Sequence, residues 1–252
     1  MGRAPLLTRD NVERAALAAG VAVFFVTGYF GIGRTVDPAR ARDLATALDR
    51  RIPFVASAVW VYLAMFPAAV SPLVLVRCPR LFRRTVAAYG VAIAVSLIVF
   101  AALPVTSVGL RADVARLDSG ALAPRAVSLL YGLDPPFNSF PSLHLSIATL
   151  AALSAWRAGR LNAWAACAGV AAIAVSVVAV KQHFVLDAAG GLILAALIYA
   201  VVVRPYEPTL GLDGISPSRS RNAMRESTVA DSEGSRRAAG DESRAARYAS
   251  LS

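Results

Sequence analysis

The sequence predicts an all-α membrane protein: a polytopic bundle of about six transmembrane helices followed by a disordered C-terminal tail. The chain of 252 residues is 57% hydrophobic and only 17% charged, whereas about 25% of the residues of a typical soluble domain are charged. Several apolar segments reach the length of about 20 residues that a helix needs to cross a bilayer. No stretch alternates apolar and polar residues over the length of a strand, which argues against a β-barrel.

The membrane domain is expected over residues 15–203, between an N-terminal cytoplasmic segment (1–14) and a polar tail (204–252). The first apolar segment is interpreted as a span and not as a cleaved signal peptide, because Asp10 and Glu13 interrupt its basic region and no A-x-A site follows it. Small residues throughout the apolar segments suit helices that pack on one another. The expected spans are 15–33, 54–76, 85–107, 142–157, 162–180 and 184–203.

Basic residues indicate the orientation. The net charge of +10 comes from arginines gathered at the ends of apolar segments, a pattern typical of topology signals and not of nucleic-acid binding. With the tail included, 17 of the 26 basic residues lie on the side of the two termini, and without it each side carries nine. The positive-inside rule then places both termini in the cytoplasm. The tail has few large apolar residues after Tyr206, so disorder is expected there.

The scarcest reactive residues are expected at one face of the membrane. The chain has two histidines, His144 and His183, and one lysine, Lys181, while Asp187 is the only acid expected inside a span. These residues lie at the starts of the fourth and sixth spans, and parity places both starts on the same side. His183 and Asp187, four residues apart, share a helix face. An ionisable residue within a span marks function by default; the alternative is a polar pair that locks two helices together.

The residues before His144 are typical of a helix N-terminus that binds an anion. Asn138 or Ser139 can cap such a helix, and Pro141 suits its first turn. The amides of residues 142–144 would then point out of the helix, where unpaired N–H groups and the helix dipole favour phosphate. An ordinary loop-to-helix cap is the other interpretation.

Two motifs, P-S-L-H at residues 141–144 and K-Q-H-F-x-x-D at residues 181–187, stand about 40 residues apart. In this order the two motifs resemble the type-2 phosphatidic acid phosphatase superfamily. Their sequence is similar to the inositol phosphorylceramide synthase branch, whereas other branches carry P-S-G-H and S-R-x5-H-x3-D. The resemblance covers roughly residues 50–200. The stretches that carry it are Phe140-Pro141-Ser142-Leu143-His144, Lys181-Gln182-His183-Phe184-Val185-Leu186-Asp187, Arg51–Phe54, Trp60, Tyr62 and Tyr131–Asn138.

Two parts of the family's pattern are missing. Nothing reproduces its first motif, K-x6-R-P; Arg111 in the third loop is the candidate for that arginine, although no proline follows it. Arg77 and Arg84 have the seven-residue offset, but parity places them at the opposite face. In the third motif Val177 stands where the family has arginine, and the resemblance implies that Lys181 replaces it.

The resemblance implies transfer of a phosphoryl head group through a phosphohistidine, with no metal or other cofactor. His183 would be the nucleophile, Asp187 would fix its tautomer, and His144 would act as general acid and then as base. The donor would be a phospholipid or a lipid phosphate, and the acceptor a lipid alcohol. The groups expected to bind the phosphate oxygens are Lys181, Arg111 and the amides of Ser142 and Leu143.

Three other functions stay open. A phosphatase with the same triad would pass the group to water. A metal-dependent enzyme is conceivable because two histidines and a carboxylate can form a facial metal triad, although Lys181 beside an amide-lined helix start favours an anion. A non-enzymatic transporter or assembly subunit would be expected to show interrupted spans or inverted repeats.

Other features narrow the setting. Cys78 and Cys167 lie at no motif spacing, which excludes a disulfide scaffold and a thiolate zinc site. Arginine outnumbers lysine 25 to one, which indicates GC-rich coding and a bacterial plasma membrane, with the site expected on its extracytoplasmic face. Residues 121–132 are partly amphipathic and are expected to form either a rim on the membrane surface or a plain connecting helix.

Overall fold

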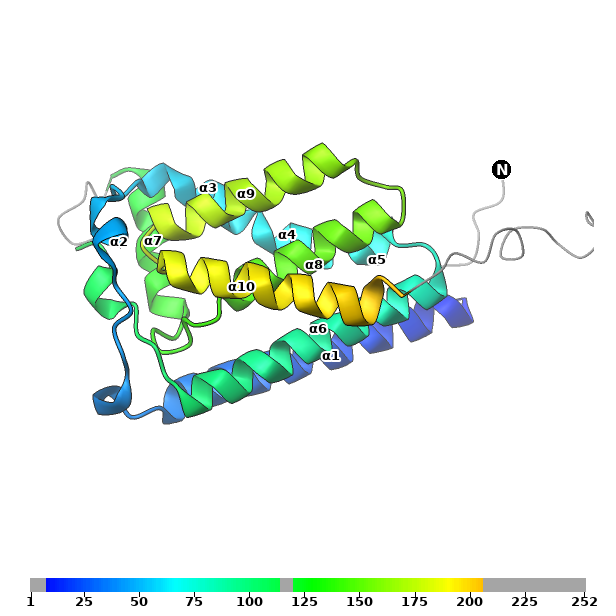
Figure 1. The fold of residues 1–252 in the computed structure, drawn as a ribbon, viewed down its shortest axis with the longest axis horizontal. Coiled ribbons are helices and arrows are strands. Elements are labelled where there is room, and N and C mark those ends of the chain that lie inside the picture. Colours follow the sequence, from blue (N-terminus) through cyan, green and yellow to red (C-terminus); the bar gives the residue numbers. More distant parts are fainter. Residues whose placement is uncertain (1–7, 114–119, 206–252) are drawn as a thin grey trace, which may run out of the picture. The chain divides into compact units, whose positions relative to one another are not determined.

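Helices account for the regular structure of the chain (Figure 1). The computed structural model describes residues 8–113 and 120–205. Within these ranges no strand forms, and only isolated bridges join Val105 to Arg42 and to Asn138, so the predicted all-α class is confirmed. The α-helices are α1 (Arg9–Thr35), α2 (Ala47–Arg51), α3 (Val59–Leu63), α4 (Met65–Val70), α5 (Pro72–Leu75), α6 (Pro79–Ala102), α7 (Leu122–Leu133), α8 (Leu143–Arg157), α9 (Ala163–Ala179) and α10 (Val185–Ile198). Short 3₁₀ turns occupy Pro38–Arg40, Ala56–Ala58 and Val108–Leu110, and a π-helical turn, Tyr199–Val203, continues α10.

Four helical stretches in the described part of the chain are long and apolar enough to cross a membrane. The fourth and fifth expected spans are helical as well, but α8 has 15 residues and α9 has 17. At 1.5 Å per residue these two helices rise about 23 to 26 Å, which is short of the hydrocarbon core of about 30 Å. The full-length helices identify a membrane protein. They are Arg9–Thr35, Ala56–Leu75, Pro79–Ala102 and Val185–Val203.

The first and third spans begin earlier than the sequence analysis placed them. α1 begins at Arg9, so the helix extends through residues 9–14 of the predicted N-terminal segment. α6 begins at Pro79, because proline suits the first position of a helix, where no N–H is needed. It ends at Ala102 and not at residue 107, since Leu103 precedes a proline and is therefore disfavoured in helical conformation.

The second expected span, 54–76, is broken into short helices. Pro67 lies within α4 and Pro72 begins α5. A proline cannot donate to the carbonyl four residues earlier, and its ring crowds that carbonyl, which explains the breaks at Ala64 and Ser71. The disordered tail expected over 204–252 lies, from residue 206 onward, outside the described residues.

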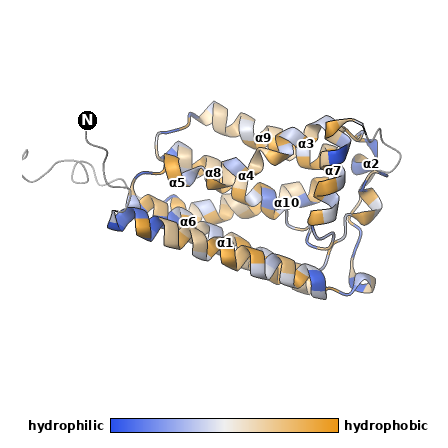
Figure 2. Ribbon diagram, turned by 180° about the vertical axis from the view of Figure 1, so that it is seen from behind, coloured by the Kyte–Doolittle hydropathy of each residue, from blue (hydrophilic) through white to orange (hydrophobic). Residues whose placement is uncertain are grey.

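The outer surface of the long helices is apolar. Figure 2 shows hydrophobic residues along α1 and α6, with hydrophilic residues gathered toward the ends of α1. Large apolar side chains that stand exposed on different helices include Val23, Ile98, Val175, Ile193 and Val201. Exposed apolar surface of this extent is typical of contact with lipid.

α8 lies at the centre of the helices that position the candidate residues, in contact with α4, α6, α9 and α10. The start of α8 lies close against the middle of α10. A Cβ atom on Gly191 would lie 2.4 Å from the carbonyl oxygen of Ser142, so only glycine permits this approach. There the Ser146 hydroxyl donates to the Gly191 carbonyl at 3.0 Å. The start of α8 is thereby fixed against α10.

Candidate active site

The two histidines lie at adjoining helix starts. His144 is the second residue of α8, and Ser142 is its N-cap, with a side chain that accepts from Leu145 N–H. The cap is therefore Ser142 and not Asn138 or Ser139 as predicted. His183 lies in the turn between α9 and α10, immediately before Phe184, the N-cap of α10.

A tight backbone turn puts His183 in this place. Lys181 adopts a left-handed conformation with φ of 57°. The N–H of Lys181 donates to Val178, and those of Gln182 and His183 donate to Val177, at 3.0 to 3.1 Å. This is the Schellman arrangement that ends many helices, usually with glycine at the left-handed position. α9 therefore ends at Ala179, and α10 begins at Val185, two residues after His183.

Four side chains form one line of hydrogen-bond contacts. The Tyr62 hydroxyl lies 3.1 Å from Nε2 of His144, and Nδ1 of His144 lies 3.0 Å from Nε2 of His183. Nδ1 of His183 lies 3.4 Å from Oδ2 of Asp187. His183 and Asp187 are almost completely buried. The structure therefore brings together the predicted triad and adds Tyr62 to it.

The direction of proton donation along this line of contacts follows from the residues at its two ends, Asp187 and Tyr62. A buried carboxylate such as Asp187 accepts hydrogen bonds when ionised, so Nδ1 of His183 carries the proton that faces it. Nε2 of His183 then presents a lone pair and accepts from Nδ1–H of His144. With the His144 ring neutral, its Nε2 accepts from the Tyr62 hydroxyl. This tautomer assignment rests on the hydrogen-bond pattern and leaves Nε2 of His183 unprotonated.

Lys181 points its side chain at α2. Its ammonium donates to the backbone carbonyls of Asp49, at 2.7 Å, and of Ile52, at 2.5 Å. Burial lowers the pKa of Lys181, while the nearby Asp49 carboxylate opposes that shift. No hydrogen bond links the Lys181 side chain to His144 or His183 within the described residues. Its ammonium is thus occupied by α2.

Arg111 is connected to the site indirectly, through Tyr131. Its guanidinium donates to the carbonyls of Tyr131, at 2.9 Å, and Asp134, at 3.1 Å, and lies 4.8 Å from the centre of the Tyr131 ring. Burial lowers the pKa of Arg111, and Asp134 opposes the shift. The Tyr131 hydroxyl in turn donates to the carbonyl of Val180. Arg111 therefore supports the turn that carries His183.

The two amides predicted to bind phosphate differ in their partners. Ser142 N–H donates to the backbone carbonyl of Asp187 at 3.0 Å, because the first turn of α10 lies against the start of α8. This amide would have to give up that bond before it could donate to an anion, so its predicted role in phosphate binding stays a prediction. The Leu143 amide, in the first turn of α8, has no such partner in the described part of the chain.

Several polar residues near the triad were missed by sequence reasoning. The carboxylate of Asp134 accepts from the Tyr29 hydroxyl at 2.7 Å and from the side-chain amide of Gln182, the residue before His183. The carboxylate of Asp49 accepts from the N–H of Val185, the first residue of α10, at 2.7 Å. Asp134 lies in the stretch Tyr131–Asn138 and Gln182 in the stretch Lys181–Asp187, so for these two residues the position within the family-like stretches was the available signal.

The described residues contain no group of three His, Cys, Asp or Glu side chains with the arrangement of a metal site. His144, His183 and Asp187 instead direct their ring nitrogens and carboxylate at one another.

Comparison with known proteins places this site within a family. Residues 41–201 match the PAP2 superfamily, and this range, more than half of the chain, contains Tyr62, His144, His183 and Asp187. Comparisons with curated proteins and with solved structures gave no match. The chain therefore belongs to the PAP2 superfamily, a group of membrane phosphatase-type enzymes that act on lipid phosphates.

Proposed function

We propose that the protein transfers a phosphoryl head group from a phospholipid to a lipid alcohol through a phosphohistidine at His183. The observation that carries the proposal is the hydrogen-bond line that leaves Nε2 of His183 unprotonated and facing His144. A nucleophile oriented by a carboxylate and placed beside a second imidazole is the arrangement that covalent catalysis requires.

In the first step Nε2 of His183 attacks phosphorus while the bond to the leaving oxygen breaks. His144, as imidazolium, gives its Nδ1 proton to that oxygen. Nδ1–H of His183 stays bonded to Asp187, whose negative charge stabilises the ring as it becomes positive. The two reactive nitrogens face each other at 3.0 Å, so the contact between the two rings must open to admit the phosphorus.

In the second step His144 takes the proton of the incoming alcohol, whose oxygen attacks phosphorus and displaces His183. Of the expected phosphate ligands, the Leu143 amide is the one that no described residue engages. Arg111, Lys181 and Ser142 would have to exchange the hydrogen bonds that they now make.

Tyr62 suits both protonation states of His144, because a hydroxyl donates to the neutral ring and accepts from the imidazolium. Tyr62→Phe should therefore lower kcat by about tenfold, the worth of one hydrogen bond to a charged group, with little change in KM. Steady-state kinetics on purified protein checks this. Tyr199→Phe, at the far end of α10, is the matched control, and equal kcat values for the two variants would contradict the role of Tyr62.

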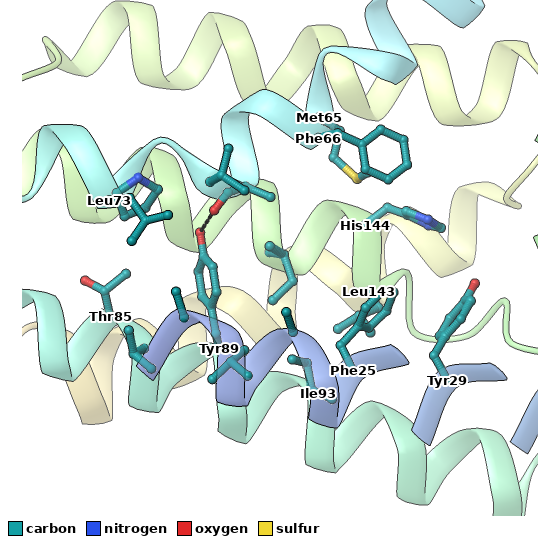
Figure 3. A pocket seen from close by; sticks show the side chains of 18 of the residues that line it. Phe25, Tyr29, Met65, Phe66, Leu73, Thr85, Tyr89, Ile93, Leu143 and His144 are labelled. Atoms are coloured by element: carbon teal, nitrogen blue, oxygen red, sulfur yellow. Dashed lines mark hydrogen bonds between the residues drawn. The ribbon is translucent and has the colours of Figure 1, made fainter. Parts of the chain in front are cut away.

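A cavity beside His144 supports a lipid substrate. It encloses about 330 Å³, and its walls, from α1, α4, α5, α6 and α8, are almost entirely apolar. Figure 3 shows His144 and Tyr29 toward one end, Leu73 and Thr85 toward the other, and Tyr89 between them. This volume lies within the range of ligand pockets. A hydrocarbon chain in the cavity would leave its phosphorylated head group beside His144.

Filling the cavity should selectively impair long-chain substrates. Ala22 on α1 lines the cavity, and Ala22→Phe should raise KM for a long-chain phospholipid by about tenfold, which corresponds to displacing roughly two methylenes at about 0.8 kcal/mol each. A short-chain soluble analogue should be affected little. Ala19→Phe, on the same helix outside the cavity lining, is the control. Equal KM changes for the two variants on long-chain substrate would contradict this assignment.

The acceptor separates the proposed transferase from a phosphatase with the same residues. The similarity of the two motifs to inositol phosphorylceramide synthases favours a lipid alcohol. The test is to incubate detergent-purified protein with mixed labelled phospholipids, with and without ceramide or diacylglycerol, and to measure lipid products by mass spectrometry beside released phosphate. A new head-group lipid that depends on the acceptor supports transfer, whereas free phosphate without a new lipid identifies a phosphatase. A parallel incubation with chelator tests the metal-dependent alternative.

The proposed location is a bacterial plasma membrane with the site at its extracytoplasmic face. Arg14 and Arg83 lie at the other end of the helices, where Arg83 pairs with Glu13 at 2.6 Å. Arg14 there donates to the carbonyls of Leu73 and Val76. Basic residues at that end are consistent with a cytoplasmic side.

A further inference from the structure

The turn that carries His183 has an unusual backbone. Lys181 is the one residue other than glycine with positive φ in the described ranges. A side chain with a Cβ atom is disfavoured in this region, and such a conformation persists when the surroundings impose it. The contacts of the Lys181 ammonium with Asp49 and Ile52 are surroundings of that kind.

The stretch 49–55 holds this turn on both sides of His183. Before the turn, Val55 N–H donates to the carbonyl of Ala179 at 3.0 Å. Within it, the Lys181 ammonium donates to two carbonyls of the stretch. After it, Val185 N–H donates to Oδ1 of Asp49 at 2.7 Å. These contacts join segments more than 120 residues apart in sequence, so they fix the turn in the tertiary structure.

The carboxylates of Asp49 and Asp187 each accept from one N–H group at the start of α10. Asp187 accepts from Phe184 N–H at 3.0 Å, and Asp49 accepts from Val185 N–H. The other oxygen of Asp49 accepts from the amide and the hydroxyl of Thr46, at 2.8 and 2.5 Å. Asp49 is fully buried. Burial alone would raise its pKa, but the hydrogen bonds from Thr46 and Val185 hold the pKa below its ordinary value.

We propose, resting on the proposed function, that Asp49 is a positioning residue for His183. Lys181 likewise holds the turn that carries His183 against the stretch 49–55 and is not a ligand of the substrate phosphate. The carboxylate of Asp49 fixes the first N–H of α10, which leaves Asp187 free to orient the ring of His183. Both oxygens of Asp49 accept from N–H groups, whereas asparagine has one oxygen, so in Asp49→Asn either Val185 N–H or Thr46 N–H faces an NH₂ group. The start of α10 then loses its fixed position, and the Asp187 carboxylate competes for Val185 N–H and turns away from Nδ1 of His183. The attacking nitrogen then loses its fixed direction toward phosphorus.

The experiment compares Asp49→Asn and Lys181→Met with the wild type, each assayed well below its thermal unfolding transition. Asp43→Asn is the matched control, since this exposed residue bonds only to Ala45 N–H of its own loop among the contacts described. Because displacement of a reacting group lowers turnover without removing substrate contacts, we expect kcat to fall on the order of tenfold to a hundredfold in both variants. KM should stay within about twofold.

Two results would overturn the inference while the proposed function stands: Asp49→Asn with the kcat of Asp43→Asn, or Lys181→Met with a raised KM and an unchanged kcat. The result for Lys181→Met would mean that Lys181 binds the substrate phosphate. A wild type without phosphotransfer would overturn both the inference and the proposed function. Lys181→Met also keeps the inference testable if Asp49→Asn does not fold.

Discussion

Replacement of His183 by alanine should lower phosphotransfer turnover on the order of 10³-fold or more, as for other deletions of a catalytic nucleophile. The variant lacks the nitrogen that forms the bond to phosphorus. Neither His144 nor Tyr62 could replace His183 as nucleophile, because neither contacts a carboxylate that would orient it. The measurement is initial rate with a labelled phospholipid, in detergent, against the wild type.

The loss must be separated from a loss of fold, because His183 is buried between His144 and Asp187. His183→Gln, which fills more of the space and keeps polar atoms there, should be equally inactive and closer to the wild type in thermal unfolding. Turnover within about tenfold of the wild type in either variant would rule out His183 as nucleophile, since a general acid–base group alone contributes 10²-fold or more.

Asp187→Asn should lower kcat on the order of 10³- to 10⁴-fold, as when the carboxylate behind a catalytic histidine becomes an amide. Phe184 N–H and Nδ1 of His183 both contact Oδ2 of Asp187, so an asparagine oxygen in that place would keep both contacts. The neutral amide would no longer stabilise the positive charge that the His183 ring gains when its Nε2 attacks phosphorus. That stabilisation is lost although the shape of the site is kept.

Asp134→Asn is the comparison for this variant. Asp134 is also a carboxylate within the site, but it contacts Tyr29 and Gln182 and not a histidine. Its loss should therefore lower kcat much less. If both asparagine variants lost activity equally, the role assigned to the charge of Asp187 would be wrong, and general disruption of polar contacts would explain the effect.

Spacing and parity predicted that the three triad residues lie together. The i, i+4 offset placed His183 and Asp187 within reach of each other, as found, although His183 lies in the turn before α10 and not on a helix face. An even number of passes between the starts of the fourth and sixth spans brought His144 to the same end. Composition fixed the all-α class for a similar reason, since apolar runs of this length have few other folds available.

The partners of the charged side chains could not be predicted in the same way. Lys181 and Arg111 donate to backbone carbonyls, and Ser142 N–H donates to the carbonyl of Asp187. Every residue carries such a carbonyl, so no sequence pattern marks the one that is used. Tyr62 is 82 residues from His144 in the chain, and only tertiary packing brings the two together.

The prolines, by contrast, were present in the sequence as signals. Pro79 at the start of α6 and Pro67 and Pro72 in the second span account for the corrected helix limits. Hydropathy alone overlooked the breaks in the second span, because the apolar run continues through Pro67 and Pro72.

Trapping the covalent intermediate tests the central claim most directly. Wild type and His183→Ala are mixed with a labelled phospholipid, quenched in alkali within one turnover, and digested, and the peptide that begins at Gln182 is examined by mass spectrometry. The account predicts an acid-labile, alkali-stable phosphoryl or head-group phosphoryl adduct on His183 of the wild type and none in the variant. Product formation with no adduct, or with an adduct on His144, would contradict it.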